Sequence, residues 1–408
     1  MDIRERVPES YVLKYYLYRG SMAASFTASI WYLYVLSKNV SYSQLAVVDS
    51  IWWGGLILFE IPTGYIGDRI GRKNSLIISS IMRTIALVAM AFAGAFAHFA
   101  LIFAFWALAS TFKSGTADAW LYDVLKAGLS EGEFARVRGR GNSTALVVSG
   151  ITALAGGYIA EVSMEYAYLA SAGVSLISLP ILFSFPSSQH VGSNDEDDEE
   201  FTILDALPVI REKFTRPPLR SFVLYVGLFY GVYWGVNFFV QPISKDFIGL
   251  EISQIGWMYA GFTALSAVVS FRTDLIKDRV GIRTWFYVIP IALGILYAGV
   301  AFLPIVAIPV FFVMRAARNV SVPLANQYIN DRTGSIGRAT VLSTAGMVYH
   351  LTTIPFELGA GTLADLPGVT PIQTVGVFGG ILVVGALVIL TLETAVTLPG
   401  KEVKQASD

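Results

Sequence analysis

The sequence predicts an all-α integral membrane protein with about twelve transmembrane helices in two pseudo-symmetric six-helix bundles. Of its 408 residues, 54% are hydrophobic and only 14% are charged, whereas soluble domains carry about a quarter charged residues. Hydropathy and length divide the chain into apolar segments, each near the length needed to cross a ~30 Å hydrocarbon core. One acidic stretch in the middle separates these segments into two equal sets.

The apolar segments of the first half are expected at residues 12–36, 44–66, 75–97, 99–126, 139–161 and 166–185. Those of the second half are expected at 219–242, 252–273, 284–302, 304–330, 338–362 and 371–394. Between them, the run Asn194-Asp195-Glu196-Asp197-Asp198-Glu199-Glu200 must be solvated. The predicted domains are therefore an N-terminal bundle at 1–185, an acidic linker at 186–218, a C-terminal bundle at 219–394 and a tail at 395–408.

Basic residues indicate the orientation of the chain, because the cytoplasmic loops of membrane proteins carry an excess of Lys and Arg. If the N-terminus is cytoplasmic, nearly all loop cations lie inside, and only Lys38 and Lys245 lie near a loop on the opposite side. We therefore predict a multi-pass protein of the plasma membrane whose termini and acidic linker are cytoplasmic.

Composition also excludes several classes of function. The net charge of −1 gives no basis for binding nucleic acid, and the absence of cysteine excludes disulfides and thiolate metal sites. The three histidines, His98, His190 and His350, lie on different segments without metal-ligand spacing. The sequence contains no glycine-rich phosphate loop and no catalytic arrangement. We expect neither an enzyme nor a metal or cofactor site.

A glycine-rich charged loop joins the second and third segments. It reads Gly64-Tyr65-Ile66-Gly67-Asp68-Arg69-Ile70-Gly71-Arg72-Lys73. Its glycines predict a tight hairpin, in which side chains at these positions would prevent the close approach of two helix ends. A degraded copy, Asp278-Arg279-Val280-Gly281-Ile282-Arg283, follows the eighth segment 210 residues later. This repetition predicts that the two halves share one architecture.

The first loop resembles the signature loop between helices 2 and 3 of major facilitator superfamily transporters, and the resemblance covers essentially the whole chain. It implies a monomeric secondary active transporter in the lipid bilayer, which moves a small organic solute by alternating access with the substrate site near the midplane between the halves. Coupling to protons is the expected energy source. The sequence looks like a permease of the drug-antiporter-like kind, but it has Lys113 in the fourth segment and no proline in the fifth.

Two alternatives to this interpretation stay open. One is efflux of hydrophobic or cationic drugs by proton antiport, which the aromatic residues of the seventh segment favour. The other is a membrane receptor or assembly subunit that has the same fold and does not transport.

The resemblance also implies a conformational latch at the cytoplasmic face, in which Asp123 at the end of the fourth segment pairs with Arg72. A simple surface salt bridge is the alternative. The expected latch residues are Gly64, Asp68, Arg69, Gly71, Arg72, Lys73 and Asp123, with Asp278, Arg279, Gly281 and Arg283 in the second copy.

Three acids within the apolar segments are candidates for proton coupling: Glu60, Asp118 and Glu357. Each charge inside the hydrocarbon region requires a partner, a water-filled cavity or a function. Glu60 suits proton transfer if it is buried, and the alternative is a permanent ion pair of Glu60 with Arg19 or Arg83.

The resemblance places helices 1, 4, 7 and 10 around the substrate cavity. Lys113 and Arg315 on two of these helices favour an anionic or zwitterionic substrate, although they could instead neutralise Glu60, Asp118 or Glu357. The residues expected to line the cavity are Arg19, Lys113, Tyr233, Asn237, Gln241, Arg315, Asn319 and Asn326.

Overall fold

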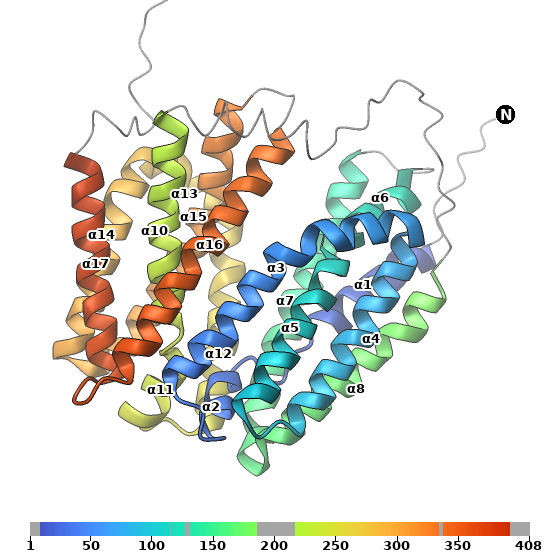
Figure 1. The fold of residues 1–408 in the computed structure, drawn as a ribbon. Coiled ribbons are helices and arrows are strands. Elements are labelled where there is room, and N and C mark those ends of the chain that lie inside the picture. Colours follow the sequence, from blue (N-terminus) through green and yellow to red (C-terminus); the bar gives the residue numbers. More distant parts are fainter. Residues whose placement is uncertain (1–8, 115, 127–130, 186–216, 334–337, 392–408) are drawn as a thin grey trace, which may run out of the picture. The chain divides into compact units, whose positions relative to one another are not determined.

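The computed structural model describes residues 9–114, 116–126, 131–185, 217–333 and 338–391 (Figure 1). These residues form helices and turns and contain no strand. Ten of the helices in this part of the chain are long and apolar enough to cross a membrane. The predicted fold class is confirmed. The predicted linker lies outside the described residues except for its last two positions.

The chain divides into two compact units. Unit 1 contains Met1–Asn194 together with Gly249–Ala267, and unit 2 contains Asp195–Ile248 together with Val268–Asp408. The first part of helix α12 (Ile252–Phe271) therefore groups with unit 1, although it follows the first helix of unit 2 in the sequence.

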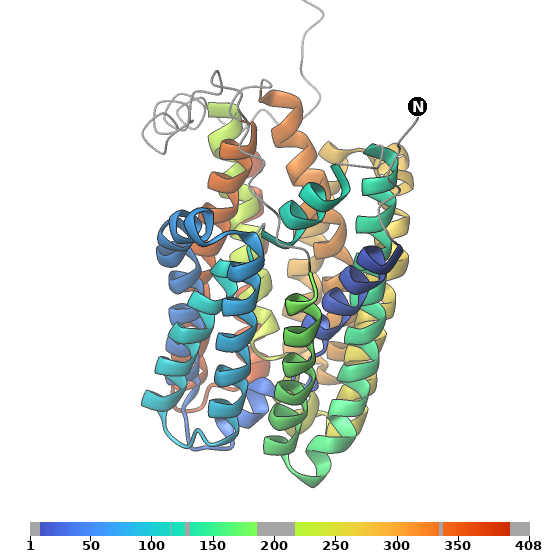
Figure 2. The same cartoon turned by 90° about the vertical axis from the view of Figure 1, so that its right-hand side faces the viewer.

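Unit 1 is built from pairs of helices that pack along one another. In the views of Figures 1 and 2, α3 lies along α5, α4 along α8 and α1 along α7. The helices are α1 (Glu9–Ala23), α2 (Trp31–Leu36), α3 (Tyr42–Ile70), α4 (Arg72–Ala91), α5 (Phe96–Lys113), α6 (Thr116–Lys126), α7 (Glu131–Val162) and α8 (Met164–Phe183).

Unit 2 repeats this construction, with α14 packed along α17 and α10 along α16. Small residues allow the first pair to approach closely, because a Cβ at Gly379 would lie 2.5 Å from the backbone of Gly294. The elements are α10 (Pro217–Asn237), α11 (Val240–Pro242), the π-helix η1 (Ile243–Phe247), α13 (Thr273–Val280), α14 (Ile282–Phe302), the 3₁₀-helix η2 (Pro304–Val306), α15 (Ala307–Arg332), α16 (Arg338–Ala364) and α17 (Pro371–Thr391).

The first predicted segment, 12–36, is not one continuous helix. Helix α1 ends at Ala23 and α2 begins at Trp31, so the intervening backbone has polar groups without helical partners. Arg83 of α4 donates to the carbonyl oxygens of Met22 at 2.5 Å and Ala24 at 2.9 Å. A backbone interruption at membrane depth is tolerated only where such partners exist.

Helices α7 and α8 supply the remaining partners of this break. The backbone N–H of Ser25 donates to the hydroxyl of Thr152, and that of Phe26 donates to the hydroxyl of Ser171, both at 3.0 Å. Gly156 of α7 makes room for the break, because a Cβ there would lie 1.9 Å from the carbonyl oxygen of Phe26. The hydropathy of the segment therefore did not predict its interruption.

The fourth predicted segment, 99–126, is also interrupted. Helix α5 ends at Lys113 and α6 begins at Thr116, with the pair Ser114-Gly115 between them in the sequence. The backbone N–H of Ser114 donates to the carbonyl oxygens of Ser110 and Thr111, both at 3.1 Å. Ser114, whose ψ of 123° ends α5, is a weak helix former, which agrees with the position where the helix stops.

The two hairpin loops have the same backbone geometry at corresponding glycines. Gly71 has φ 85° and ψ 153°, and Gly281 has φ 76° and ψ 149°. Such a positive φ favours glycine over every other residue. Close approach also explains Gly67, where a Cβ would lie 3.2 Å from Ser75 Oγ. Close approach was also expected at Gly64. That expectation is wrong, because a Cβ there would meet no atom within 4 Å.

Candidate functional site

Cations of the first hairpin loop bind backbone carbonyls at the ends of neighbouring helices. Arg72 donates to the carbonyl oxygen of Ala119 in α6 at 2.6 Å. Lys73 donates to the carbonyl oxygens of Phe183 at 2.9 Å and Phe185 at 2.6 Å, at the end of α8. Helix C-termini carry partial negative charge, so the contact of Lys73 with the end of α8 is electrostatically favourable, whereas Arg72 binds the first turn of α6.

The other expected latch residues lie at the surface. Asp68 is exposed and Arg69 stacks on the Tyr65 ring at 4.3 Å. The side chain of Asp123, and therefore its predicted pairing with Arg72, lies outside the described residues. In the second copy, Asp278 and Arg279 are exposed, and Arg283 lies over the Tyr287 ring at 5.4 Å.

The three candidate acids have three different environments. Asp118 forms an ion pair with Arg138 at 2.8 Å, whereas Glu357 of α16 is fully buried. Glu60 is exposed on α3 and forms no ion pair with Arg19 or Arg83, so that alternative is wrong. Arg19 instead donates to Asn142, and Arg83 binds the backbone of the α1 break.

A fourth acid, Asp49, is buried on α3 and was not among the predicted coupling residues. Only 5% of its surface is exposed, and it accepts a hydrogen bond from the Tyr32 hydroxyl at 3.0 Å. The sequence carries a signal for it, because Asp49 shares a helical stripe with Trp53, which is also buried. An intramembrane carboxyl is a functional-site candidate by default.

In unit 2, the predicted polar residues of two helices meet. Arg315 of α15 donates to the side-chain oxygen of Asn237 of α10 at 2.7 Å. Asn237 and Gln241 are buried, Asn319 is half-buried and Asn326 is exposed. The hydrogen bond between Arg315 and Asn237 joins an arginine and an amide that lie on separate predicted segments.

Arg318 of α15 lies against three aromatic rings of α10. Its guanidinium carbon is 5.9 Å from the ring centre of Tyr230 and 5.4 Å from those of Tyr233 and Trp234. Cation–π attraction favours this position. The aromatic residues that suggested a site for hydrophobic cations therefore already contact a cation of the protein itself. The sequence-based predictions gave Arg318 no role.

No group of His, Cys, Asp and Glu in the described part of the chain is arranged to hold a metal ion. The polar sites are therefore built from cations, amides, hydroxyls and isolated carboxyls. Such sites suit the binding of a solute or a proton.

Comparison with known proteins places the whole arrangement in a family. The model of the Major Facilitator Superfamily matches residues 17–356, which is most of the chain. The chain belongs to the Major Facilitator Superfamily. This membership shows that the protein is a membrane transport protein and that it crosses the bilayer several times.

Relatives within the superfamily are distant. The MFS-type transporter YxaM of Bacillus subtilis (strain 168), described as uncharacterized, is 23% identical over 321 residues, which cover 76% of this chain and 77% of YxaM. The likewise uncharacterized MFS-type transporter YcaD of Shigella flexneri is 23% identical over 254 residues, which cover 61% of each chain.

Solved superfamily structures share the fold. A mutant of the nucleoside transporter NupG has a TM-score of 0.78 at 15% identity and covers 95% of this chain and 100% of its own. The D-xylose-proton symporter has a TM-score of 0.69 at 14% identity and covers 94% of this chain and 96% of its own. At these identities, the likeness establishes the superfamily fold alone.

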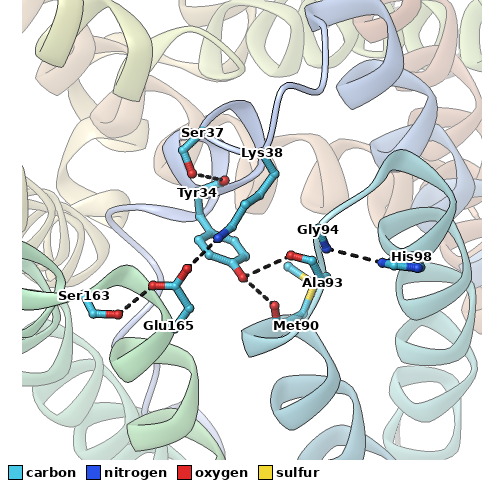
Figure 3. Close-up of polar contacts among 9 residues, drawn as sticks. All are labelled: Tyr34, Ser37, Lys38, Met90, Ala93, Gly94, His98, Ser163 and Glu165. Carbon is cyan, nitrogen blue, oxygen red and sulfur yellow. Dashed lines mark hydrogen bonds and ion pairs between the residues drawn. The ribbon is translucent and has the colours of Figure 1, made fainter.

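A polar cluster joins α2, α4 and α8 at the end of unit 1 that lies opposite Gly71 (Figure 3). Lys38 forms an ion pair with Glu165 at 2.6 Å, and Ser163 donates to the other carboxylate oxygen at 2.6 Å. The Lys38 ammonium also lies over the Tyr34 ring, whose hydroxyl donates to the Met90 carbonyl at 2.7 Å.

We expect Lys38 and Glu165 to be energetically coupled by about 1 kcal/mol, because the pair is partly buried and shares its carboxylate with a hydroxyl donor. A double-mutant cycle of Lys38→Gln and Glu165→Gln, measured by thermal unfolding in detergent, gives this coupling directly. Coupling should weaken at 1 M salt if it is electrostatic. Additive effects of the two substitutions would contradict it.

Proposed function

We propose that the protein is a secondary active transporter that moves a small organic solute across the plasma membrane by alternating access, coupled to protons. Both termini are cytoplasmic in this proposal. Membership of the Major Facilitator Superfamily is the observation that carries it. The distribution of basic residues along the sequence supports the orientation.

The buried polar groups support a transport function over a purely structural one. Polar and charged groups inside a membrane cost free energy and are retained mainly on solute and ion pathways. Asn237 of α10 and Gln241 of α11, together with Arg315 of α15, supply amide and guanidinium donors within unit 2. Because Arg318 contacts the α10 aromatic rings, those rings give little support to efflux of hydrophobic cations.

The test is uptake and efflux in proteoliposomes with a panel of solutes, with and without an imposed pH gradient. We expect accumulation of at least one solute above its external concentration only when the gradient is present. A folded, correctly inserted protein that neither transports any solute nor changes accessibility at its two faces on ligand addition would favour the non-transporting receptor.

Glu60 stays our first candidate for the proton carrier, although it is exposed, whereas the prediction from the sequence required a buried carboxyl for that role. It is exposed on α3 beside exposed apolar residues such as Leu58 and Ile61, and its carboxylate has no hydrogen bond or ion pair within the described residues. The charged form is costly there unless water or a cation reaches it, whereas the protonated form is tolerated.

We expect Glu60→Gln to abolish gradient-driven accumulation and to preserve counterflow of the same solute, because exchange requires no net proton movement. Glu165→Gln serves as the control, since its carboxylate is held by Lys38 and it is not a coupling candidate. Unchanged accumulation in Glu60→Gln would transfer the role to Asp49 or Glu357, both of which are buried.

A further inference from the structure

The interior of unit 1 brings together three cations from three helices. They are Arg19 on α1, Arg83 on α4 and Lys113 at the end of α5. Lys113 interacts electrostatically with both arginines, and so does Tyr18, which precedes Arg19 on α1. The cluster adjoins the α1 break, because Arg83 binds the carbonyl oxygens of Met22 and Ala24 there.

This cluster has more hydrogen-bond donors than acceptors. Arg19 gives one hydrogen bond to Asn142, and its Nε has no partner. The Tyr18 hydroxyl, in a side chain only 1% exposed, is also without a partner. Lys113 is partly buried and makes no hydrogen bond or ion pair with any described residue. Three side chains that interact electrostatically through Arg19 therefore each have a donor available.

Carboxylates of the protein do not balance these charges. None of the three cations forms an ion pair with a carboxylate in the described ranges. Two acids of unit 1 already have other cationic partners: Asp118 pairs with Arg138, and Glu165 pairs with Lys38. Within the described residues, the cluster is therefore positively charged and has no ion pair with a protein carboxylate.

Helix ends offset only part of the charge. Helix α1 ends at Ala23 and α5 ends at Lys113, and each helix C-terminus carries about half of a negative elementary charge. The two ends together balance about one of the three positive charges. About two positive charges remain, and such a charge inside a membrane protein requires a counterion.

We propose that Arg19, Tyr18 and Lys113 bind the anionic group, a carboxylate or a phosphate, of the transported solute, and that Arg83 holds the broken helix α1 in place beside it. The inference rests on the proposed function in treating the anion as cargo. Guanidinium and ammonium donors match an oxyanion in both charge and hydrogen bonding. Arg83 is a positioning residue, since its guanidinium binds the backbone.

The test measures thermal unfolding of the full-length protein in nanodiscs of phosphatidylcholine alone, with probes in matched pairs at equal ionic strength. Benzoate is compared with benzamide, and glycerol 3-phosphate with glycerol. We expect at least one anion to raise the melting temperature by a few degrees while its neutral partner does not. Equal shifts within both pairs, or no shift in either, would overturn the inference.

Variants assign the effect to the cluster. Lys113→Gln and Arg19→Gln should each remove the anion-dependent shift, and Lys113→Arg should retain it. Lys38→Gln is the control, because Lys38 is a cation of the same unit that already has Glu165 as its partner. A shift that persists in both cluster variants, or that Lys38→Gln removes equally, would contradict the assignment. Using two separate cluster variants keeps the test valid if one does not fold.

A lipid headgroup offers the same chemistry as a phosphate solute, and a second arm separates the two. Nanodiscs in which phosphatidylglycerol replaces part of the phosphatidylcholine should leave the response to the small anion intact. Stabilisation by phosphatidylglycerol alone, dependent on Lys113, would identify a lipid site and overturn the inference.

Transport assays then separate this inference from the proposed function. Uptake of a neutral solute at an unchanged rate by Lys113→Gln would refute the anion site and leave transport standing. Lys113-dependent anion binding without any transport would refute the proposed function and leave the site standing.

Discussion

Substitution of Gly156 by alanine should prevent the native form of the first transmembrane segment. A Cβ at this position would lie 1.9 Å from the carbonyl oxygen of Phe26 and 2.6 Å from its carbonyl carbon. Both are backbone atoms, which cannot turn away as a side chain can. Overpacking against mobile side chains costs about 1–3 kcal/mol, and we expect at least ~3 kcal/mol here.

The measurement is thermal unfolding in detergent, together with the monodispersity of the purified protein. Gly173→Ala is the control, because a Cβ at Gly173 on α8 would meet no atom within 4 Å. Alanine there should be neutral or slightly stabilising, since it favours the helix. Equal melting temperatures for the Gly156→Ala protein and the wild type would show that the α1 break does not pack on α7 in the membrane.

Replacement of Asp68 by asparagine should reduce transport roughly tenfold or more while the protein stays folded in the membrane, a loss of ~1.4 kcal/mol or more in transition free energy. Asp68 of the first hairpin loop lies in the last turn of α3, and Arg72 and Lys73, which begin α4 after Gly71, bind the first turn of α6 and the end of α8. Removing its charge changes the electrostatic balance of this loop without changing its size. The effect should therefore appear in the transport rate and not in the melting temperature.

Asp278→Asn provides the matched comparison, because Asp278 occupies the corresponding position beside Gly281 and has no hydrogen bond or ion pair within the described residues. We expect a clearly smaller loss of transport there. Transport by Asp68→Asn at the wild-type rate, with normal amounts of protein in the membrane, would remove the latch hypothesis.

The fold class followed from the sequence because the bilayer imposes a simple rule on length and hydrophobicity. The repeated hairpin was also predictable, since both copies retain the glycine that a positive φ requires. Arg315 was identified as an intramembrane cation for the same energetic reason that makes such residues rare. These features depend on local sequence.

The interruption of the first segment was not predictable in this way. Its backbone partners, Thr152 and Ser171, lie more than a hundred positions further along the chain. A hydropathy average over residues 24–30 does not distinguish an interrupted segment from a continuous helix. The contacts of Asp118 with Arg138 and of Arg315 with Asn237 have the same character, because each joins two separate helices.

The broken first helix has a consequence for how the chain is made. During synthesis the residues of α1 and α2 leave the ribosome first, whereas the groups that bind the exposed backbone between them arrive with α4, α7 and α8. An unpaired backbone polar group in lipid is costly, so residues 12–36 should first enter the bilayer as one uninterrupted helix. This helix would then unwind at 24–30 only when Arg83, Thr152 and Ser171 have been inserted. A segment that is synthesised before α4, α7 and α8 thus reaches its final conformation only after them.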